Sequence, residues 1–570
     1  MQNLAPPAPL WRPSGATKIE LLASATVALV CVGLIVYPLF FLLAESINVG
    51  DPQTFPPKDI GIDNFIDLSL DLTVLLNTAY VAIAATAMAI AAGFVLAWIL
   101  TRTNVPGKAL LERLLEIPFY LTPLVGALAW SILAAPKSGF LNQLLVTVVG
   151  VSDLLDIYTP FGIAWVMALF EGTVAFVMIS AVMKSMDPSL EESSRVTGAG
   201  KLRTLFKITL PLVLPGLLGA IVFVFAEMLG SFAAALVLGL PGRFFVVTTA
   251  IWQYTLSYPP EYGKASALGL ALFGVMFATL SFYRWVVRRG TFATISGKAF
   301  QPRPIDMGRA RYGLAAICWL YVFVAVILPI AALLLTSCLR FATVIVDQMS
   351  FTLQNYETAL TLDAVRSALT NSLELGIGVA TVGVFVMAVL VWIIYRSRLP
   401  GRGAVEYVVM FPQSVPRMVF GLALLTAWLN IPIPLYGTLW VLAIAYFTVL
   451  MPLGVRTLSG VVLQIDKSLE ECAQVCGATW AYRMRTIAVP LLRPGLVAAW
   501  LLIFIASVRE IGVSIYLMGP NSKVIAPAIV SSWSSAGTEL TAAMAMIQTA
   551  AVLLAVLLLL SVTAKFFKGA

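Results

Sequence analysis

The chain has 570 residues, of which 60% are hydrophobic and only 11% are charged, and its mean hydropathy is +0.95. Soluble domains carry about 25% charged residues, so this composition predicts a polytopic membrane protein and leaves no room for a nucleic-acid-binding role. The formal charge of +8 suits basic loops beside anionic lipid. Because the chain contains no histidine and no C-x-x-C pair, zinc sites, haem sites and histidine-based catalysis are disfavoured.

Twelve apolar stretches are long enough to cross a membrane as helices, and they fall into two series of six. The first series lies at 22–44, 76–101, 111–134, 160–184, 212–238 and 264–287, and the second at 312–337, 370–396, 405–428, 436–457, 493–518 and 540–566. The predicted fold class is an all-α polytopic membrane protein with about 12 transmembrane helices. The first stretch is too long for a signal-peptide core, so we expect it to be retained.

The distribution of lysine and arginine predicts the orientation in the membrane. Segments 184–207 and 284–311 are rich in both, whereas the loop 45–75 carries five aspartates and a single lysine. Because basic loops stay on the cytoplasmic side, both termini are expected there. The acidic loop could dock a basic face of a binding protein, but we favour the ordinary charge bias of exported loops.

The second half of the chain repeats the first. Six landmarks recur 294 residues later: Asn77, Trp98, Arg102, Pro106, Gly107 and Pro118 match Asn371, Trp392, Arg396, Pro400, Gly401 and Pro412. Later landmarks, from Leu190 to Gly216, recur 279 residues on. The smaller offset places about fifteen extra residues in the outer loop 135–159. We therefore predict a parallel duplication, with one half at 1–290, a basic cytoplasmic linker at 291–311 and a second half at 312–570.

One cytoplasmic segment is duplicated with particular fidelity: MDPSLEESSRVTGAGKLRTLFKITLPLVLPG and IDKSLEECAQVCGATWAYRMRTIAVPLLRPG. Each copy predicts a short surface helix, a glycine turn, an amphipathic stretch and a proline that starts a membrane helix. Asp187 and Asp466, or the serines two residues after them, are candidate caps of the short helices. Gly198 and Gly477 allow the positive φ that the turn needs. Two copies with charged surface residues suggest a partner that binds twice.

Both copies resemble the EAA motif of permease subunits of ATP-binding-cassette (ABC) importers, at residues 192–211 and 471–490. The matching residues are Glu192, Gly198, Ile208, Leu210 and Pro211, then Glu471, Gly477, Ile487, Val489 and Pro490. Ser193 and Ser194 stand at the two alanines of the motif in the first copy, and Cys472 and Ala473 in the second. Over nearly its whole length the chain resembles the fused, double-length type I permeases of the ferric-iron, thiamine and 2-aminoethylphosphonate uptake group, and the ferric-iron type most.

This resemblance implies that 187–200 and 466–479 are coupling helices, each docking on one of two copies of an ATPase subunit. The residues implied in docking are Leu190, Glu191, Glu192, Gly198, Leu469, Glu470, Glu471 and Gly477. ATP-Mg would be bound by the partner, this chain would be a transport subunit without a cofactor or enzymatic activity, and a periplasmic or lipid-anchored binding protein would deliver the solute. The expected location is the bacterial inner membrane. The G-A-G-K run at 198–201 is no phosphate loop, because Leu202 follows the lysine.

Among the charged residues inside predicted spans, we single out Glu171, Glu227, Arg509 and Glu510. Charged residues within a membrane usually face a pore, water or a partner. We hypothesise that Glu227, Arg509 and Glu510 line or gate the translocation path between the halves. The alternative is a pair in the bundle interior or a position near the outer interface.

Two other functions remain open on sequence alone. A secondary transporter with parallel halves would need no ATPase, although the duplicated motif argues against it. The cargo could be ferric iron, thiamine, 2-aminoethylphosphonate or another small solute. A membrane-embedded enzyme is disfavoured by the lack of histidine and of clustered carboxylates at matched depth.

Overall fold

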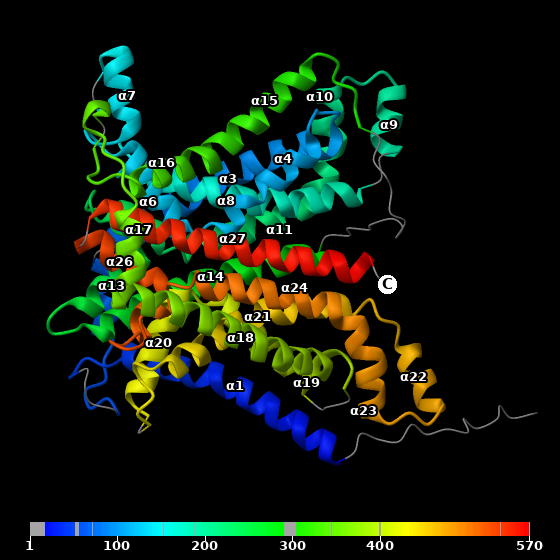
Figure 1. Cartoon of the computed structure of the whole chain (residues 1–570). Coiled ribbons are helices and arrows are strands. Elements are labelled where there is room, and N and C mark those ends of the chain that lie inside the picture. The colour runs from blue at the N-terminus through cyan, green and yellow to red at the C-terminus, as the bar shows by residue number, and fades with distance from the viewer. Residues whose placement is uncertain are drawn as a thin grey trace, which may run out of the picture.

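The computed structural model describes residues 18–568 apart from the gaps 52–55, 71, 152, 187–188, 290–303, 344, 398–400, 432 and 536. Within this part, the chain is a bundle of helices without a β-strand (Figure 1). Ten helices are long and apolar enough to cross a membrane, and two bent helix pairs raise the number to twelve. This confirms the predicted all-helical fold with about twelve spans.

The helices follow the duplicated order of the sequence. In the first part they are α1 (Lys18–Ser46), α2 (Asp63–Leu70), α3 (Thr73–Arg102), α4 (Lys108–Leu115), α5 (Ile117–Tyr120), α6 (Pro123–Ala134), α7 (Phe140–Val149), α8 (Pro160–Ser185), α9 (Ser189–Val196), α10 (Lys201–Thr204), α11 (Leu210–Leu229), α12 (Ala233–Gly239), α13 (Val247–Leu256) and α14 (Tyr262–Arg289). In the second they are α15 (Ala310–Val322), α16 (Leu328–Ser337), α17 (Gln354–Thr361), α18 (Asp363–Tyr395), α19 (Arg402–Met410), α20 (Arg417–Leu429), α21 (Leu439–Val462), α22 (Lys467–Val475), α23 (Trp480–Arg483), α24 (Val489–Val508), α25 (Ser514–Leu517), α26 (Ile525–Ser535) and α27 (Thr538–Lys568).

Two of the predicted spans, 111–134 and 405–428, are broken helices. The chain direction bends by 98° at the break in the first stretch and by 108° in the second. Proline causes both breaks, because the residue before a proline is pushed out of the helical region. Thr122 before Pro123 has ψ 143°, and Val415 before Pro416 has ψ 125°.

Two further predicted stretches, 212–238 and 493–518, also end early. Helix α11 ends at Leu229 and α24 ends at Val508, and each is followed by a turn and a short helix, α12 or α25. The bundle therefore contains four interruptions, two in each half.

The halves are interleaved at their first helices. Helix α1 packs against α18 and α20 of the second half, while α16 packs against α6 of the first half. Helices α3 and α8 form a tight pair, since a Cβ added at Gly93 would lie 2.6 Å from the Cβ of Ala175 and 2.8 Å from the backbone nitrogen of Phe176. Helix α1 begins, and α27 ends, at the end of the bundle that carries α9 and α22 (Figure 1).

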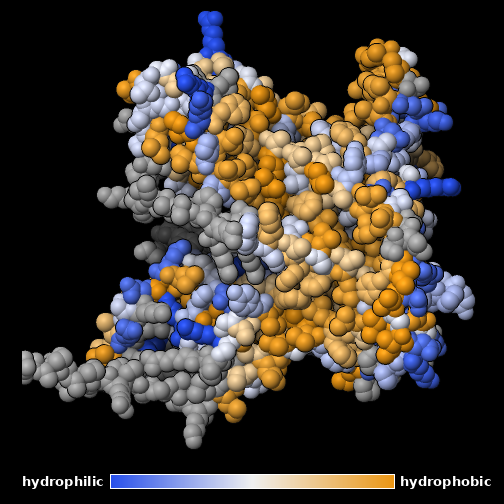
Figure 2. Space-filling view, turned by 180° about the vertical axis from the view of Figure 1, so that it is seen from behind, coloured by the Kyte–Doolittle hydropathy of each residue, from blue (hydrophilic) through white to orange (hydrophobic). Residues whose placement is uncertain are grey.

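The extra residues of the first half form α7, which projects from the opposite end of the bundle (Figure 1). Asn142 anchors its base, because the buried amide donates to the carbonyls of Ala135 and Leu155 at 2.9 and 2.7 Å. The far part of α7 exposes apolar side chains, among them Leu144 and Val148. Figure 2 shows hydrophobic side chains over the middle of the bundle and hydrophilic ones gathered toward its ends.

We expect Gly93→Ala to destabilise the protein by about 1–3 kcal/mol, because the methyl group overpacks the α3–α8 contact. Gly378→Ala on α18 is the matched control, since no atom lies within 4 Å of the added Cβ there. Removing a helical glycine should leave the control unchanged or stabilise it by up to about 1 kcal/mol. Thermal unfolding in detergent measures the stability of both variants. Equal melting temperatures for Gly93→Ala and Gly378→Ala would refute the packing argument.

Candidate functional site

Both duplicated surface segments form short helices at one end of the bundle, α9 and α22 (Figure 1). Asp466 caps α22, because its carboxylate accepts a hydrogen bond from the backbone nitrogen of Ser468 at 2.9 Å. That bond also lowers the pKa of Asp466. The corresponding cap, Asp187, lies outside the described residues.

Each of these helices ends at a left-handed glycine, as predicted. Gly198 has φ +86° and Gly477 has φ +79°. The following amides close the turn, with Ala199 donating to the Ser194 carbonyl at 3.1 Å and Ala478 to the Ala473 carbonyl at 3.0 Å. The glycines are open to solvent space, because nothing lies within 4 Å of a Cβ added at either position.

Equivalent apolar side chains stand exposed on both helices. Leu190 and its counterpart Leu469 are each 47% exposed, and Val196 and Val475 are exposed still further. Glu471 is exposed and Glu192 half-buried. Each helix therefore offers a small surface with an apolar part and a carboxylate, which suits a protein partner.

Glu191, which the sequence placed among the docking residues, lies in a different environment. It is 2% exposed, and its carboxylate is 3.6 Å from the guanidinium of Arg102, whose side chain is equally buried. In this arrangement Glu191 faces the membrane bundle and not the exposed surface of α9. Its counterpart in the second copy, Glu470, lies among the side chains that the structure does not describe.

The three charged residues of the predicted path, Glu227, Arg509 and Glu510, lie where the spans are interrupted. Glu227 lies in the last turn of α11, Arg509 and Glu510 directly follow α24, and Glu171 lies in the middle of α8. Glu171 interacts electrostatically with Glu227 and Arg509, so residues of both halves meet here. We call these four residues together with Arg417 the charged junction.

Arg417 is the member that sequence reasoning missed. It begins α20 directly after the break at Pro416, and its guanidinium is 2.8 Å from the carboxylate of Glu510. The side chain of Arg417 is 46% exposed and that of Glu510 only 1%. The sequence did contain a signal for Arg417, because a charged residue next to a proline is unusual inside an apolar stretch such as 405–428.

Backbone groups at the helix breaks form hydrogen bonds with side chains of the charged junction. The guanidinium of Arg509 donates to the carbonyl of Phe119, at the bend of the broken span in the first half. Glu510 accepts a hydrogen bond from the backbone nitrogen of Val513 at 3.2 Å. Ionised side chains thus complete the hydrogen bonding that the interrupted helices lack.

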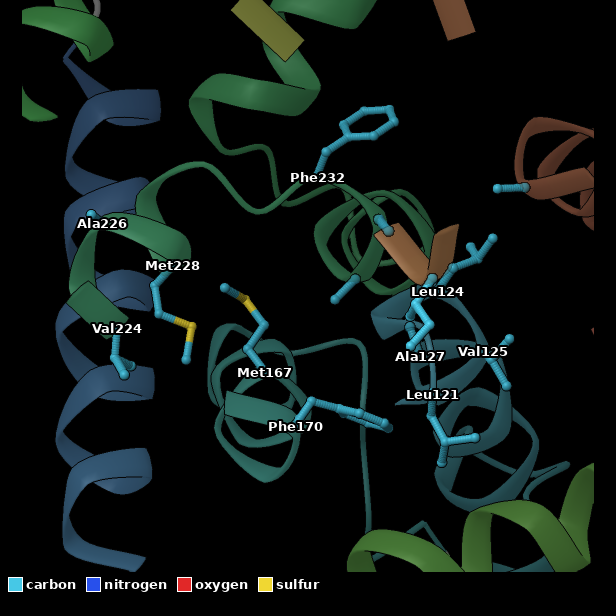
Figure 3. Close-up of a cluster of buried hydrophobic side chains, with 14 of the residues drawn as sticks. Leu121, Leu124, Val125, Ala127, Met167, Phe170, Val224, Ala226, Met228 and Phe232 are labelled. Carbon is cyan, nitrogen blue, oxygen red and sulfur yellow. The ribbon is translucent and has the colours of Figure 1, made fainter. Parts of the chain in front are cut away.

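An apolar cluster lies beside the junction in the first half. Figure 3 shows Met167 of α8 and Met228 of α11 pointing toward each other, and Phe170 pointing toward α6. The Phe170 ring fills the space at Gly126, where an added Cβ would lie 2.0 Å from it. Since Phe170 and Met228 directly adjoin Glu171 and Glu227 in the sequence, apolar packing fixes the helices that carry these carboxylates.

Among the described residues, no three histidine, cysteine, aspartate or glutamate side chains are grouped so that they could hold a metal ion. The three glutamates of the junction are accompanied by two arginines, Arg417 and Arg509.

The comparison with protein families decides which kind of membrane protein this is. The family model for the binding-protein-dependent transport system inner membrane component matches residues 70–291 and 381–568. The chain belongs to this family. One match falls in each of the predicted halves, so this chain contains two copies of the permease domain.

Two curated relatives that match most of this chain are named as ferric transport permeases. The chain is 26% identical over 504 residues to the putative ferric transport system permease protein FbpB 1 of Haemophilus influenzae, covering 86% of this chain and 76% of the relative. It is 25% identical over 505 residues to the ferric transport system permease protein FbpB of Actinobacillus pleuropneumoniae, covering 86% and 70%. A solved bacterial ABC transporter that imports alginate matches with a TM-score of 0.41 and 19% identity, over 48% of this chain and 97% of that one.

The cysteines of α22 provide a test of the exposed surface. Cys472 and Cys476 are exposed, whereas Cys31 and Cys318 are buried in the bundle. We expect a polar maleimide to label the first two within minutes in detergent and the buried pair only after unfolding. Mass spectrometry of the labelled peptides measures this, with the Cys472→Ser, Cys476→Ser variant as control. Rapid labelling of Cys31 in the folded protein would contradict the arrangement.

Proposed function

We propose that this chain is the permease of an ATP-driven, binding-protein-dependent importer and that its cargo is ferric iron. The observation that carries the proposal is the pair of equivalent exposed helices, α9 and α22, at one end of a duplicated bundle. The names of the ferric relatives support the cargo. The same machinery could carry thiamine, 2-aminoethylphosphonate or another small solute, and substrate-dependent ATP hydrolysis discriminates among them.

Two copies of an ATPase subunit would dock on the exposed surfaces, one on α9 and one on α22. Leu190 and Glu192 would make the contact in the first half, and Leu469 and Glu471 in the second. ATP-Mg would be held by these partners. Because ATP is cytoplasmic, this end of the bundle faces the cytoplasm, and so do the start of α1 and the end of α27. The chain would lie in the bacterial inner membrane.

A soluble binding protein would deliver the cargo at the opposite end, and the charged junction would form part of the path. Supporting this, the side chains of Glu227 and Arg417 are exposed, and the two interact electrostatically across the halves. ATP binding would draw α9 and α22 together and open the path outward, and hydrolysis would reset it. Such alternation between two global states moves cargo without a continuous pore.

We expect Gly198→Asp combined with Gly477→Asp to abolish association with the ATPase. The substitution strains a left-handed turn by about 1–2 kcal/mol per site and adds a negative charge to each docking surface. Co-purification of the tagged ATPase measures the effect. Gly403→Asp, at the start of α19 with open space around its Cβ, is the control and should retain the partner. Normal co-purification of the double variant would refute the docking assignment.

We expect Glu227→Gln and Glu510→Gln each to lower uptake roughly tenfold or more, a loss equivalent to about 1.4 kcal/mol. Both variants should still assemble with the ATPase, because the junction is remote from α9 and α22. Uptake of radioactive iron into proteoliposomes measures transport, with Glu357→Gln on the exposed helix α17 as control. Unchanged uptake in both variants would remove the junction from the path.

A further inference from the structure

We propose that Arg102, Glu191 and Thr209 form a buried joint that transmits motion of the docking helix α9 to the membrane helices. The joint rests on the proposed function, because it presumes that an ATPase moves α9. Glu191 is its centre, since this one carboxylate contacts the guanidinium of Arg102 and accepts a hydrogen bond from the hydroxyl of Thr209 at 2.6 Å. These three residues are positioning residues and touch no cargo.

The joint connects α9 to three membrane helices. Arg102 is the last residue of α3, and its guanidinium also donates to the carbonyl of Met183 in the last turn of α8 at 2.8 Å. Thr209 ends the π-helical turn Leu205–Thr209 that leads into α11. Any displacement of α9 is therefore delivered to the inner ends of α3, α8 and α11 together.

Two of these helices carry carboxylates of the charged junction. Glu171 lies on α8 and Glu227 on α11, so the joint and the junction occupy the same rigid elements. The close contact of α3 with α8 at Gly93 prevents the two from sliding independently. A packed pair of this kind transmits a displacement because protein interiors are dense and barely compressible.

Burial makes the joint stiff. The side chains of Arg102 and Glu191 are 1% and 3% exposed, so water cannot replace either partner when α9 moves. An ion pair at the surface would separate at little cost, and the exposed pair Lys184–Glu112 at the same end of the bundle, 3.3 Å apart, is of that kind. A buried pair instead resists separation, because each charge would be left without a partner.

The linker between the halves contacts the same place. The backbone nitrogen of Ile305 donates to the carbonyl of Arg102 at 2.8 Å, and the amide of Asn104 donates to the carboxylate of Asp306 at 2.7 Å. The start of the second half is thus fastened to the joint of the first.

Part of the arrangement recurs in the second half. Arg396, the counterpart of Arg102, donates to the carbonyl of Val462 at 2.8 Å, and Val462 is the counterpart of Met183. At the position of Thr209, however, the second copy has Ala488, which offers no hydroxyl. The hydroxyl bond of the joint is therefore a feature of the first half, and the two docking helices are held differently.

The test is Glu191→Gln in the complex of the chain with its ATPase, reconstituted with the loaded binding protein. The amide retains the size of the side chain and can accept the Thr209 bond but lacks the charge that pairs with Arg102. We expect the ATPase to co-purify as in the wild type, while cargo moved per ATP hydrolysed falls about tenfold, within the roughly 5–150-fold range of coupling between sites. Glu112→Gln is the matched control and should keep the wild-type ratio.

If Glu191→Gln does not fold, the milder variant Thr209→Val serves as the test. It should also lower the amount of cargo moved per ATP hydrolysed. Loss of ATPase co-purification in Glu191→Gln would overturn the proposal in favour of a direct docking contact. If uptake and hydrolysis fall together, so that cargo moved per ATP is unchanged, the Arg102–Glu191 pair has only a structural role. That outcome would also overturn the proposal. A wild-type chain that binds no ATPase would instead refute the proposed function itself.

Discussion

Backbone polar groups have no water to bind inside a membrane, and this constraint governs the whole structure. Every uninterrupted span satisfies it within one helix, but the breaks after Tyr120, Ser414, Leu229 and Val508 leave groups unbonded. Such breaks are tolerated only where protein or water covers them. Here the interior covers them with ionised side chains, as when Arg509 binds the carbonyl of Phe119. Polar interior and interrupted helices thus require each other, and the proposed path lies where they coincide.

The two candidate sites are linked by the helices that run between them. Helices α8 and α11 carry carboxylates of the junction. Helix α11 is connected to Glu191 of α9 through Thr209, and α8 through Arg102, which binds both Glu191 and the carbonyl of Met183. In the proposed mechanism, a partner docked on α9 would not need to touch the path in order to change it. It would move α9 as a rigid body, whose two ends are the left-handed turn at Gly198 and the buried ion pair.

Sequence alone predicted the features that depend on spacing. The two constant offsets between repeats gave the duplicated architecture, and the shorter offset located the insertion that forms α7. Gly198 and Gly477 were predicted to adopt positive φ because a turn was required between two helical segments, and both do. Family membership and the ferric relatives agree with the resemblance seen in the duplicated motif.

What the sequence did not predict depends on contacts between distant segments. Adjacent glutamates such as Glu191 and Glu192 look alike in a motif, and only the position of Arg102 on α3 shows which one turns inward. Arg417 escaped notice because its stretch is apolar enough to pass for an ordinary span, although its prolines break the helix. The bends themselves are invisible to hydropathy, which measures apolar content and not direction.

The central claim is that two copies of an ATPase act through α9 and α22 on this chain. The most direct measurement is ATP hydrolysis by the chain co-purified with its ATPase and reconstituted in lipid, with the binding protein empty or loaded with Fe³⁺. The account predicts that the Fe³⁺-loaded binding protein stimulates ATP hydrolysis. The same protein mixed with thiamine or 2-aminoethylphosphonate instead of Fe³⁺ should give no stimulation. If no ATPase associates and uptake follows an ion gradient, the chain is a secondary transporter and the account is contradicted.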